Sequence, residues 1–144
     1  MAEAISGTIK LNIITPERRL VENFDAVSVT LYTSEGQIQL LPGHVPLIGT
    51  LEVGVFYYVA TDGREGAGVI SSGFFEVKDD VLQVIAETLE LKEEIDIARA
   101  RRAQEKAEEV LREAGLDEDR FKKYQLKLYR SIVRQQFGAK NSTE

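Results

Sequence analysis

The chain has 144 residues, 43% of them apolar, and a formal net charge of −6, so it can form one domain or two small ones and lacks the overall basic charge of a general nucleic-acid binder. With no cysteine and one histidine, it excludes a disulfide framework, a thiol nucleophile and a zinc site made of cysteine and histidine. Its start has no signal-peptide pattern, and no apolar run reaches the ~20 residues that span a bilayer. We therefore expect a soluble, cytosol-facing protein that reaches a membrane only through partners.

Glycine and proline divide the chain into two parts. All three prolines and nine of the eleven glycines precede residue 74. Because these residues mark turns and are rare inside helices, their distribution predicts a strand-rich domain over residues 1–90 and a helical domain over residues 91–144.

The first domain contains five runs in which apolar and polar residues alternate, the pattern of half-buried strands. The alternating positions are Ile9, Leu11 and Ile13; Val27, Val29 and Leu31; Val55, Tyr57 and Val59; Phe75 and Val77; and Val81, Gln83 and Ile85. Turn residues separate the runs at Thr15-Pro16, Ser34 to Gly36, Pro42-Gly43, Asp62-Gly63 and Asp79-Asp80. Short strands at this spacing predict an antiparallel β-sandwich.

The second domain shows the three- and four-residue spacing of helices. A first helix of about 20 residues is expected from Ile95 to Gly115, with a narrow seam of small residues that lets another helix approach closely. The seam consists of Ala100, Ala103, Ala107, Val110 or Leu111, and Ala114. After a two-residue break, the acidic residues 117–119 open a second helix that we expect to run to about Phe137, with Gly138 and a frayed polar tail behind it. The predicted class is α+β: an N-terminal antiparallel β-sandwich followed by a C-terminal two-helix antiparallel hairpin.

The second helix has more apolar surface than one partner helix needs. Its two stripes are Phe121, Tyr124, Leu128 and Ile132, and Leu126, Tyr129, Val133 and Phe137. One stripe can pack on the alanine seam. The other can pack either on the sandwich or on a partner protein, and both interpretations remain open.

Charge is strongly uneven along the chain. Residues 1–94 contain six Lys or Arg against fifteen Asp or Glu, whereas residues 120–140 contain seven Lys or Arg and no acidic residue. Four of these cations, Lys123, Lys127, Arg130 and Arg134, share one side of the second helix, the basic face. A solvated surface explains such a face, and so does an acidic protein partner or a phosphate. The alternative function is therefore an adaptor or nucleic-acid-binding protein that uses this helix, although no motif of RNA binding accompanies it.

Four segments, taken in order, resemble a known family. They are residues 11–17, residues 34–38 with 41–47, residues 72–77, and residues 95–100. In this order they resemble the epsilon subunits of bacterial F-type ATP synthases. The resemblance implies a non-catalytic central-stalk subunit that turns with the rotor and couples the rotation of the proton-driven c-ring to the catalytic head. It also implies a peripheral position at the cytoplasmic face of the bacterial plasma membrane, and no nucleic acid as partner.

The resemblance implies that the sandwich binds the gamma subunit and the c-ring. The matching contact positions are Ser34, Glu35, Gly36, Gln37, Pro42, Gly43 and His44. We expect His44 to be a turn or interface residue rather than a base or a ligand, and we expect no metal. No catalytic site is expected either, because the glycine-rich stretch 63–68 lacks the Gly-Lys-Ser/Thr ending of a Walker loop.

The helical domain matches the regulatory arm of that family. An extended arm lies along gamma and inhibits ATP hydrolysis, which implies that the basic face meets the alpha and beta catalytic subunits. In several members the folded arm also binds regulatory ATP, and the matching positions are Glu90, Ile95, Asp96, Arg99, Ala100, Arg130 and Arg134. Lys106 stands where the family pattern has arginine. Without nucleotide, Asp96 can cap the first helix and pair with Arg99, and Ala100 can pack in the seam. No other cofactor is expected.

Overall fold

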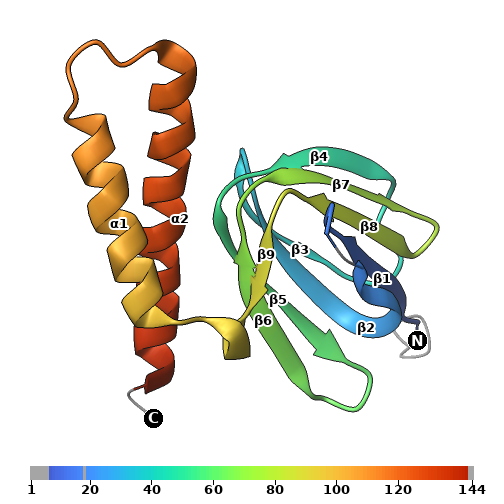
Figure 1. Cartoon of the computed structure of the whole chain (residues 1–144). Coiled ribbons are helices and arrows are strands. Elements are labelled where there is room, and N and C mark those ends of the chain that lie inside the picture. Colours follow the sequence, from blue (N-terminus) through green and yellow to red (C-terminus); the bar gives the residue numbers. More distant parts are fainter. Residues whose placement is uncertain (1–6, 18, 143–144) are drawn as a thin grey trace. The chain divides into compact units, whose positions relative to one another are not determined.

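The computed structural model describes residues 7–17 and 19–142. The chain divides into two compact units, Met1–Leu89 and Glu90–Glu144 (Figure 1). The expected architecture, a β-sandwich followed by two helices, is confirmed.

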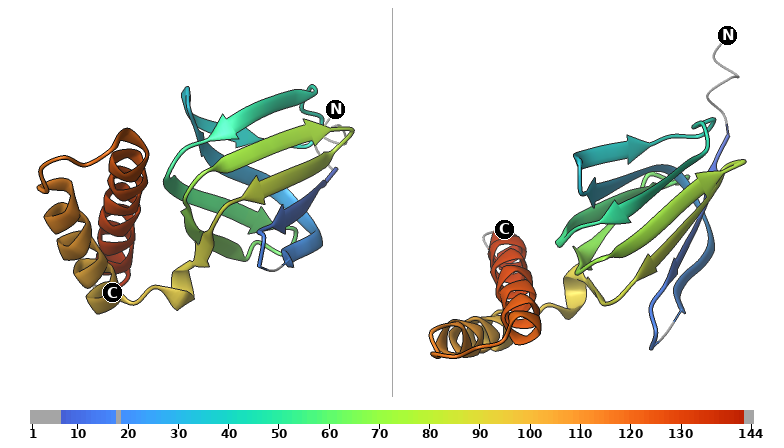
Figure 2. Two further views of the ribbon diagram at one scale, coloured as in Figure 1. Left: turned by 45° about the horizontal axis from the view of Figure 1, so that its top comes forward. Right: turned by 90° about the horizontal axis from the view of Figure 1, so that it is seen from above.

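The first unit is a sheet folded over into two layers, seen in Figures 1 and 2. Its strands are β1 (Ile9–Ile14), β2 (Arg19–Thr33), β3 (Gly36–Leu40), β4 (Leu47–Leu51), β5 (Gly54–Ala60), β6 (Glu65–Ile70), β7 (Gly73–Lys78) and β8 (Val81–Ala86), and β9 (Leu89–Leu91) spans the boundary between the units. One layer has the order β1-β8-β7-β4, and the other contains β3, β2, β5 and β6. The long β2 joins the layers, because it pairs with β1 in its first half and with β3 and β5 in its second.

The sandwich is not wholly antiparallel. β1 and β8 run parallel, with Lys10 opposite Val81 and Ile14 opposite Ile85, whereas the other pairings with a described register are antiparallel. β1 and β8 are distant in sequence and no tight turn connects them, so no local signal predicts whether they run parallel or antiparallel. This parallel pair is an exception, which the sequence did not predict, within a sandwich whose other described pairings are antiparallel as expected.

In β5 and β8 the buried face is opposite to the expected one. Phe56 is 1% exposed, and Leu82 and Val84 are fully buried, whereas Tyr57 and Ile85, which belong to the expected runs, are 46% and 53% exposed. Both strands have apolar residues at odd and at even positions, so alternation alone does not say which set faces the core. The expected strands were found in place, but the choice of face was wrong for these two.

The second unit consists of a 3₁₀ turn (Lys92–Glu94) and two helices, α1 (Ile97–Leu111) and α2 (Glu118–Ser142). The Asp96 carboxylate accepts the backbone N–H of Arg99 at 3.0 Å and caps α1, and Asp117 caps α2 through the N–H of Arg120 at 2.7 Å. Each cap satisfies a backbone donor that the first turn of a helix leaves unpaired. The acidic start expected for the second helix is therefore confirmed.

The helix lengths differ from the expected ones. α1 has 15 residues rather than about 20, because its last turn tightens: the N–H of Arg112 bonds to Glu109 and that of Glu113 to Val110. Ala114 thus falls outside the helix, and Gly115, with φ of 75°, lies in a connection longer than the expected two residues. α2 has 25 residues and continues to Ser142, past the predicted end at Phe137. The predicted frayed tail lies partly in this helix and partly outside the described residues.

Gly138 is a contact point rather than a helix stop. A Cβ at this position would come within 2.9 Å of Ile97 Cγ1 and 3.1 Å of Ile95 Cγ2. The chain at the start of α1 therefore approaches α2 more closely than any larger residue permits. Glycine inside a helix costs about 1 kcal/mol relative to alanine, and the close packing offsets this cost.

Candidate functional site

The two helices line a partly open cavity of about 230 Å³ within the second unit. We call it the cationic cavity. Its lining consists of Arg99, Ala103, Lys106, Ala107, Tyr124, Lys127, Arg130 and Arg134. The cavity exists because the alanine side chains on α1 are small, and basic side chains from both helices line it. The lining contains five cations and no carboxylate, a composition suited to a ligand with several negative charges.

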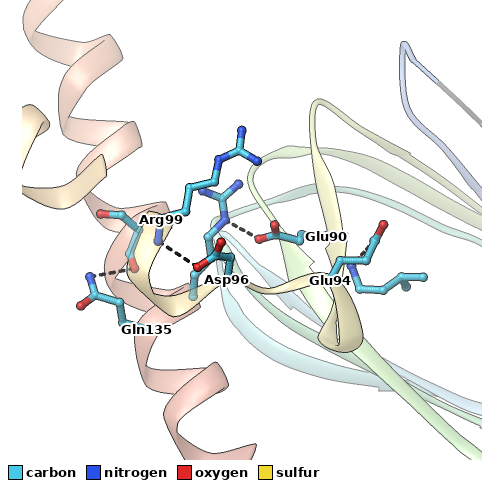
Figure 3. Close-up of polar contacts among 8 residues, drawn as sticks. Glu90, Glu94, Asp96, Arg99 and Gln135 are labelled. Carbon is cyan, nitrogen blue, oxygen red and sulfur yellow. Dashed lines mark hydrogen bonds and ion pairs between the residues drawn. The ribbon is translucent and has the colours of Figure 1, made fainter. Parts of the chain in front are cut away.

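Two polar contacts attach α2 to its neighbours in this unit, and Figure 3 labels Glu90 and Gln135, one residue of each contact. Arg134 Nε lies 2.6 Å from Glu90 Oε1, and both side chains are about a quarter exposed, at 23% and 24%. Gln135 Nε2 donates to Gln104 Oε1 at 2.6 Å and so joins α2 to α1 directly. Sequence reasoning missed the glutamine pair, because no motif around Gln104 or Gln135 indicates that the two side chains meet.

The residues proposed for nucleotide binding are only partly brought together. Arg99, Arg130 and Arg134 line the cationic cavity, and Glu90 is attached to it through its ion pair with Arg134. The other three, Ile95, Asp96 and Ala100, do not line the cavity and make structural contacts of their own.

Asp96 caps α1 through the backbone N–H of Arg99, which is the structural role foreseen for it (Figure 3). Ala100 is 2% exposed, and Ile95 lies where a side chain on Gly138 would meet it. These three residues shape the base of the hairpin and do not line the cavity.

The basic face is divided by the closed hairpin. Lys127, Arg130 and Arg134 line the cationic cavity, whereas Lys123 is exposed and outside it. The Tyr124 ring has Lys127 Nζ 5.0 Å from its centroid and the Arg120 guanidinium at 5.4 Å. Cations near an aromatic face are attracted to it, so Tyr124 helps to position Lys127. Sequence reasoning placed Tyr124 in an apolar stripe and did not identify it as a site residue.

A second candidate surface is the loop around His44 in the first unit. The N–H of Gly43, whose φ is 85°, donates to Asp80 Oδ1 at 2.7 Å, and the N–H of His44 donates to Leu41 O at 3.2 Å. His44 Nδ1 donates to Val45 O at 2.6 Å. The histidine thus stabilises its own loop, and Asp80, from the β7–β8 turn, fixes the loop from outside.

The turn over residues 34–37 is similarly fixed. Thr33 Oγ1 donates to Gly36 O at 2.7 Å and accepts the N–H of Glu35 at 3.1 Å, and Thr50 Oγ1 donates to Ser34 Oγ at 3.0 Å. Gly36 has φ of 110°, which favours glycine. The proposed contact residues therefore lie on two loops that are held by hydrogen bonds.

An exposed apolar patch on the sandwich was missed by sequence reasoning. Ile14, Ile48, Phe74 and Ile85 line a depression of about 430 Å³ on the outer side of β1, β8, β7 and β4. Ile48 and Phe74 are 71% and 60% exposed. The available signal was the pairing of apolar neighbours, such as Phe74-Phe75, which gives a strand two apolar faces. Exposed patches of this kind commonly mark contacts with other proteins.

Within residues 7–17 and 19–142, no group of three or more His, Asp or Glu side chains is placed to hold a metal ion. In the same part of the chain, no helix is long and apolar enough to cross a membrane.

Both units match known domain families. Residues 8–92 match the profile described as "ATP synthase, Delta/Epsilon chain, beta-sandwich domain", and residues 93–137 match "ATP synthase, Delta/Epsilon chain, long alpha-helix domain". The ATP synthase epsilon chain of Trichlorobacter lovleyi is 34% identical over 132 residues, which cover 92% of this chain and 94% of that one. That of Halalkalibacterium halodurans is 37% identical over 131 residues, covering 88% and 94%.

Solved structures show the same fold. A chain in the cryo-EM structure of the Euglena gracilis mitochondrial ATP synthase, OSCP/F1/c-ring, has a TM-score of 0.77 at 23% identity and is covered over 79% of its length by 88% of this chain. A chain in the Tetrahymena thermophila mitochondrial ATP synthase, central stalk/c-ring, has a TM-score of 0.55 at 20% identity, with 94% and 98% covered.

Fold and domain order together define a subunit type of a rotary ATP synthase: a β-sandwich with a helical-hairpin arm. The chain belongs to the ATP synthase delta/epsilon chain family, which confirms the resemblance seen in its sequence.

Proposed function

We propose that this chain is a non-catalytic subunit of the central stalk, which turns with the rotor of a proton-translocating F-type ATP synthase. The observation that carries the proposal is the match of both family domains, in order, over residues 8–137. The relatives reported above are bacterial and carry the name epsilon chain, which supports a peripheral position at the cytoplasmic face of a bacterial plasma membrane.

The sandwich is the part that holds the subunit on the rotor. The turn over residues 34–37 and the loop 42–44 contact the gamma subunit and the c-ring, and their hydrogen bonds support such a role because a preformed surface loses little conformational freedom on binding. Pull-down with gamma tests this point. The full chain and a chain without residues 92–144 should both retain gamma. Loss of gamma from the shortened chain, if it remains folded, would contradict the assignment.

The helical arm inhibits ATP hydrolysis when it extends into the catalytic head. Placed end to end, helices of 15 and 25 residues reach ~60 Å. Opening the hairpin exposes the cations that now line the cavity, and these meet acidic surfaces of the alpha and beta subunits.

A triple variant tests the inhibition: Lys123→Ala, Arg130→Ala and Arg134→Ala together. We expect the variant to inhibit hydrolysis at least tenfold less than the wild type in the reconstituted complex, because charge-assisted contacts are each worth about 1.5–3 kcal/mol. Replacing Arg101 and Arg102, exposed cations of α1, by alanine provides the control. Equal inhibition by the triple variant and the wild type would contradict the proposal.

The folded hairpin also binds ATP as a regulatory ligand. The cationic cavity supports this, because Arg99, Arg130 and Arg134 meet there from two helices. ATP at ten times its Kd would favour the binding-competent hairpin by only about 1.4 kcal/mol. ATP therefore shifts the equilibrium toward the closed hairpin without preventing it from opening. Equilibrium dialysis of the full chain should show saturable binding. No saturable binding at millimolar ATP would overturn this part of the proposal.

A further inference from the structure

The linker that leads from the sandwich to α1, residues 90–96, buries little of itself. None of the residues in its 3₁₀ turn, Lys92–Glu94, is buried. Hydrogen bonds give it a local shape: the N–H of Leu91 donates to Glu94 Oε1 at 2.9 Å (Figure 3), and the N–H of Ile95 donates to Lys92 O at 3.4 Å. Such bonds stabilise an exposed turn only weakly, because water competes for the same groups. The linker therefore depends on a neighbouring surface for its order.

That surface is the C-terminal end of α2, where Arg134, Phe137 and Gly138 share one face of the helix. At the start of the linker, Arg134 Nε lies 2.6 Å from Glu90 Oε1. In the 3₁₀ turn, Lys92 Nζ lies 5.6 Å from the centroid of the Phe137 ring, a distance at which a cation is attracted to an aromatic face. One face of α2 thus follows the linker along its length.

The tightest contact lies where the linker enters α1. Gly138 is buried, and a Cβ on it would come within 3.1 Å of Ile95 Cγ2 and 2.9 Å of Ile97 Cγ1. Phe137 beside it is 7% exposed. Because apolar burial and close packing stabilise a contact more than exposed polar groups do, residues 137 and 138 contribute most of the stabilisation of the linker.

We propose that the end of α2 at Phe137 and Gly138 holds the linker in place, and that local release of this end, before α1 and α2 separate along the rest of their length, frees the hairpin to swing on the linker. The last turn of a helix is where opening begins, because its final carbonyl groups have no partner within the helix. The rest of the helix pair keeps its own buried residues, Ala100, Ala107 and Val110 on α1. The inference goes beyond the proposed inhibition and takes from it only that the arm moves.

The test measures exchange of the Leu91 and Ile95 amides in the full chain by nuclear magnetic resonance. In Phe137→Ala both amides should exchange at least about tenfold faster, because the buried ring no longer holds α2 against the linker. Lys92→Gln keeps the ring and removes only the cation, so the acceleration should be about threefold. Phe121→Ala is the matched control, since it makes the same substitution at an exposed ring ~24 Å away along α2, and it should change neither amide.

Val110→Ala separates local release from opening of the whole hairpin. Val110 is 7% exposed at the other end of α1, so its truncation loosens the helix pair away from the linker. The linker amides should stay within about twofold of their wild-type exchange rates in this variant. Equal acceleration in Val110→Ala and Phe137→Ala would show that the linker only follows separation of the helices, and would overturn the inference.

Unchanged exchange of both amides in Phe137→Ala would overturn it as well. Circular dichroism shows whether the helices of that variant remain folded. If they do not, Lys92→Gln decides, because it changes only an exposed side chain: faster exchange supports the inference and unchanged exchange contradicts it. Neither amide reports on ATP hydrolysis, so the proposed inhibition by the arm stands or falls by its own test.

Discussion

The sandwich and the hairpin differ in the side chains that they bury. The largest fully buried side chains, such as Phe56, Leu11 and Leu82, all belong to the sandwich. The hairpin buries alanines at 100 and 107, with Val110, Ser131 and Phe137. Alanine releases little apolar surface from water, so the helices gain less from each contact than the strands do. The comparison therefore predicts that opening the hairpin costs less free energy than unfolding the sandwich.

The largest effect is expected from the core of the sandwich. Phe56→Ala removes a ring that is 1% exposed and should lower the free energy of unfolding by about 3–5 kcal/mol, measured by urea denaturation. Phe74→Ala, at 60% exposure on the outer face, serves as the control and should cost much less. Similar losses in the two variants would mean that the sandwich core does not carry the stability of this unit.

A smaller effect is expected where the helices meet. Gly138→Leu places a side chain against Ile95 and Ile97 and should destabilise the closed hairpin by about 1–3 kcal/mol, even though leucine is the better helix former. Amide hydrogen exchange of α1 and α2 measures the opening. Gln136→Leu, an exposed neighbour, is the control and should leave the exchange nearly unchanged. A slower exchange in Gly138→Leu would show that helix propensity, and not close packing, governs this position.

The smallest effect concerns the loop at His44. Asp80→Gly keeps a residue that tolerates the positive φ of 60° but removes the acceptor for the Gly43 N–H, at a cost of about 0.5–1.5 kcal/mol. Exchange of the Gly43 amide should become faster and binding of the c-ring weaker. Asp80→Asn retains an acceptor and should restore both.

Asp79→Gly is the matched control for this loop, because Asp79 occupies the same turn with φ of 51°. It should change neither the Gly43 amide nor c-ring binding. If Asp79→Gly and Asp80→Gly behave alike, the effect comes from the turn backbone and not from the Asp80 carboxylate.

The sequence predicted features that depend on neighbours along the chain. Turns at Asp62-Gly63 and Asp79-Asp80, the cap at Asp96 and the acidic start of α2 all rest on local backbone chemistry, and the structure contains them. Pairings between distant segments escaped prediction. The parallel β1–β8 pair has no local signature, and neither has the Gln104–Gln135 contact.

Gly138 shows why local signals also mislead. Glycine after an amphipathic run usually marks a helix end, and here it marks a close approach to Ile97, more than 40 residues away in sequence. Only part of the lining of the cationic cavity could be predicted from the sequence, because local signals do not show which residues of the two helices face each other. The arginines belong to recognisable segments, whereas Tyr124 and Lys127 enter the site only through the register of α1 against α2.

Hydrogen exchange of the full chain, with and without ATP, tests the central claim most directly, namely that the hairpin opens independently of the sandwich and that ATP shifts it toward the closed form. Without ATP, amides of α1 and α2 should exchange faster than those of β1, β2 and β8, because the hairpin opens without global unfolding. ATP should slow exchange in the helices and leave the strands unchanged. Equal protection of both units, or an ATP effect spread evenly over both, would contradict the account.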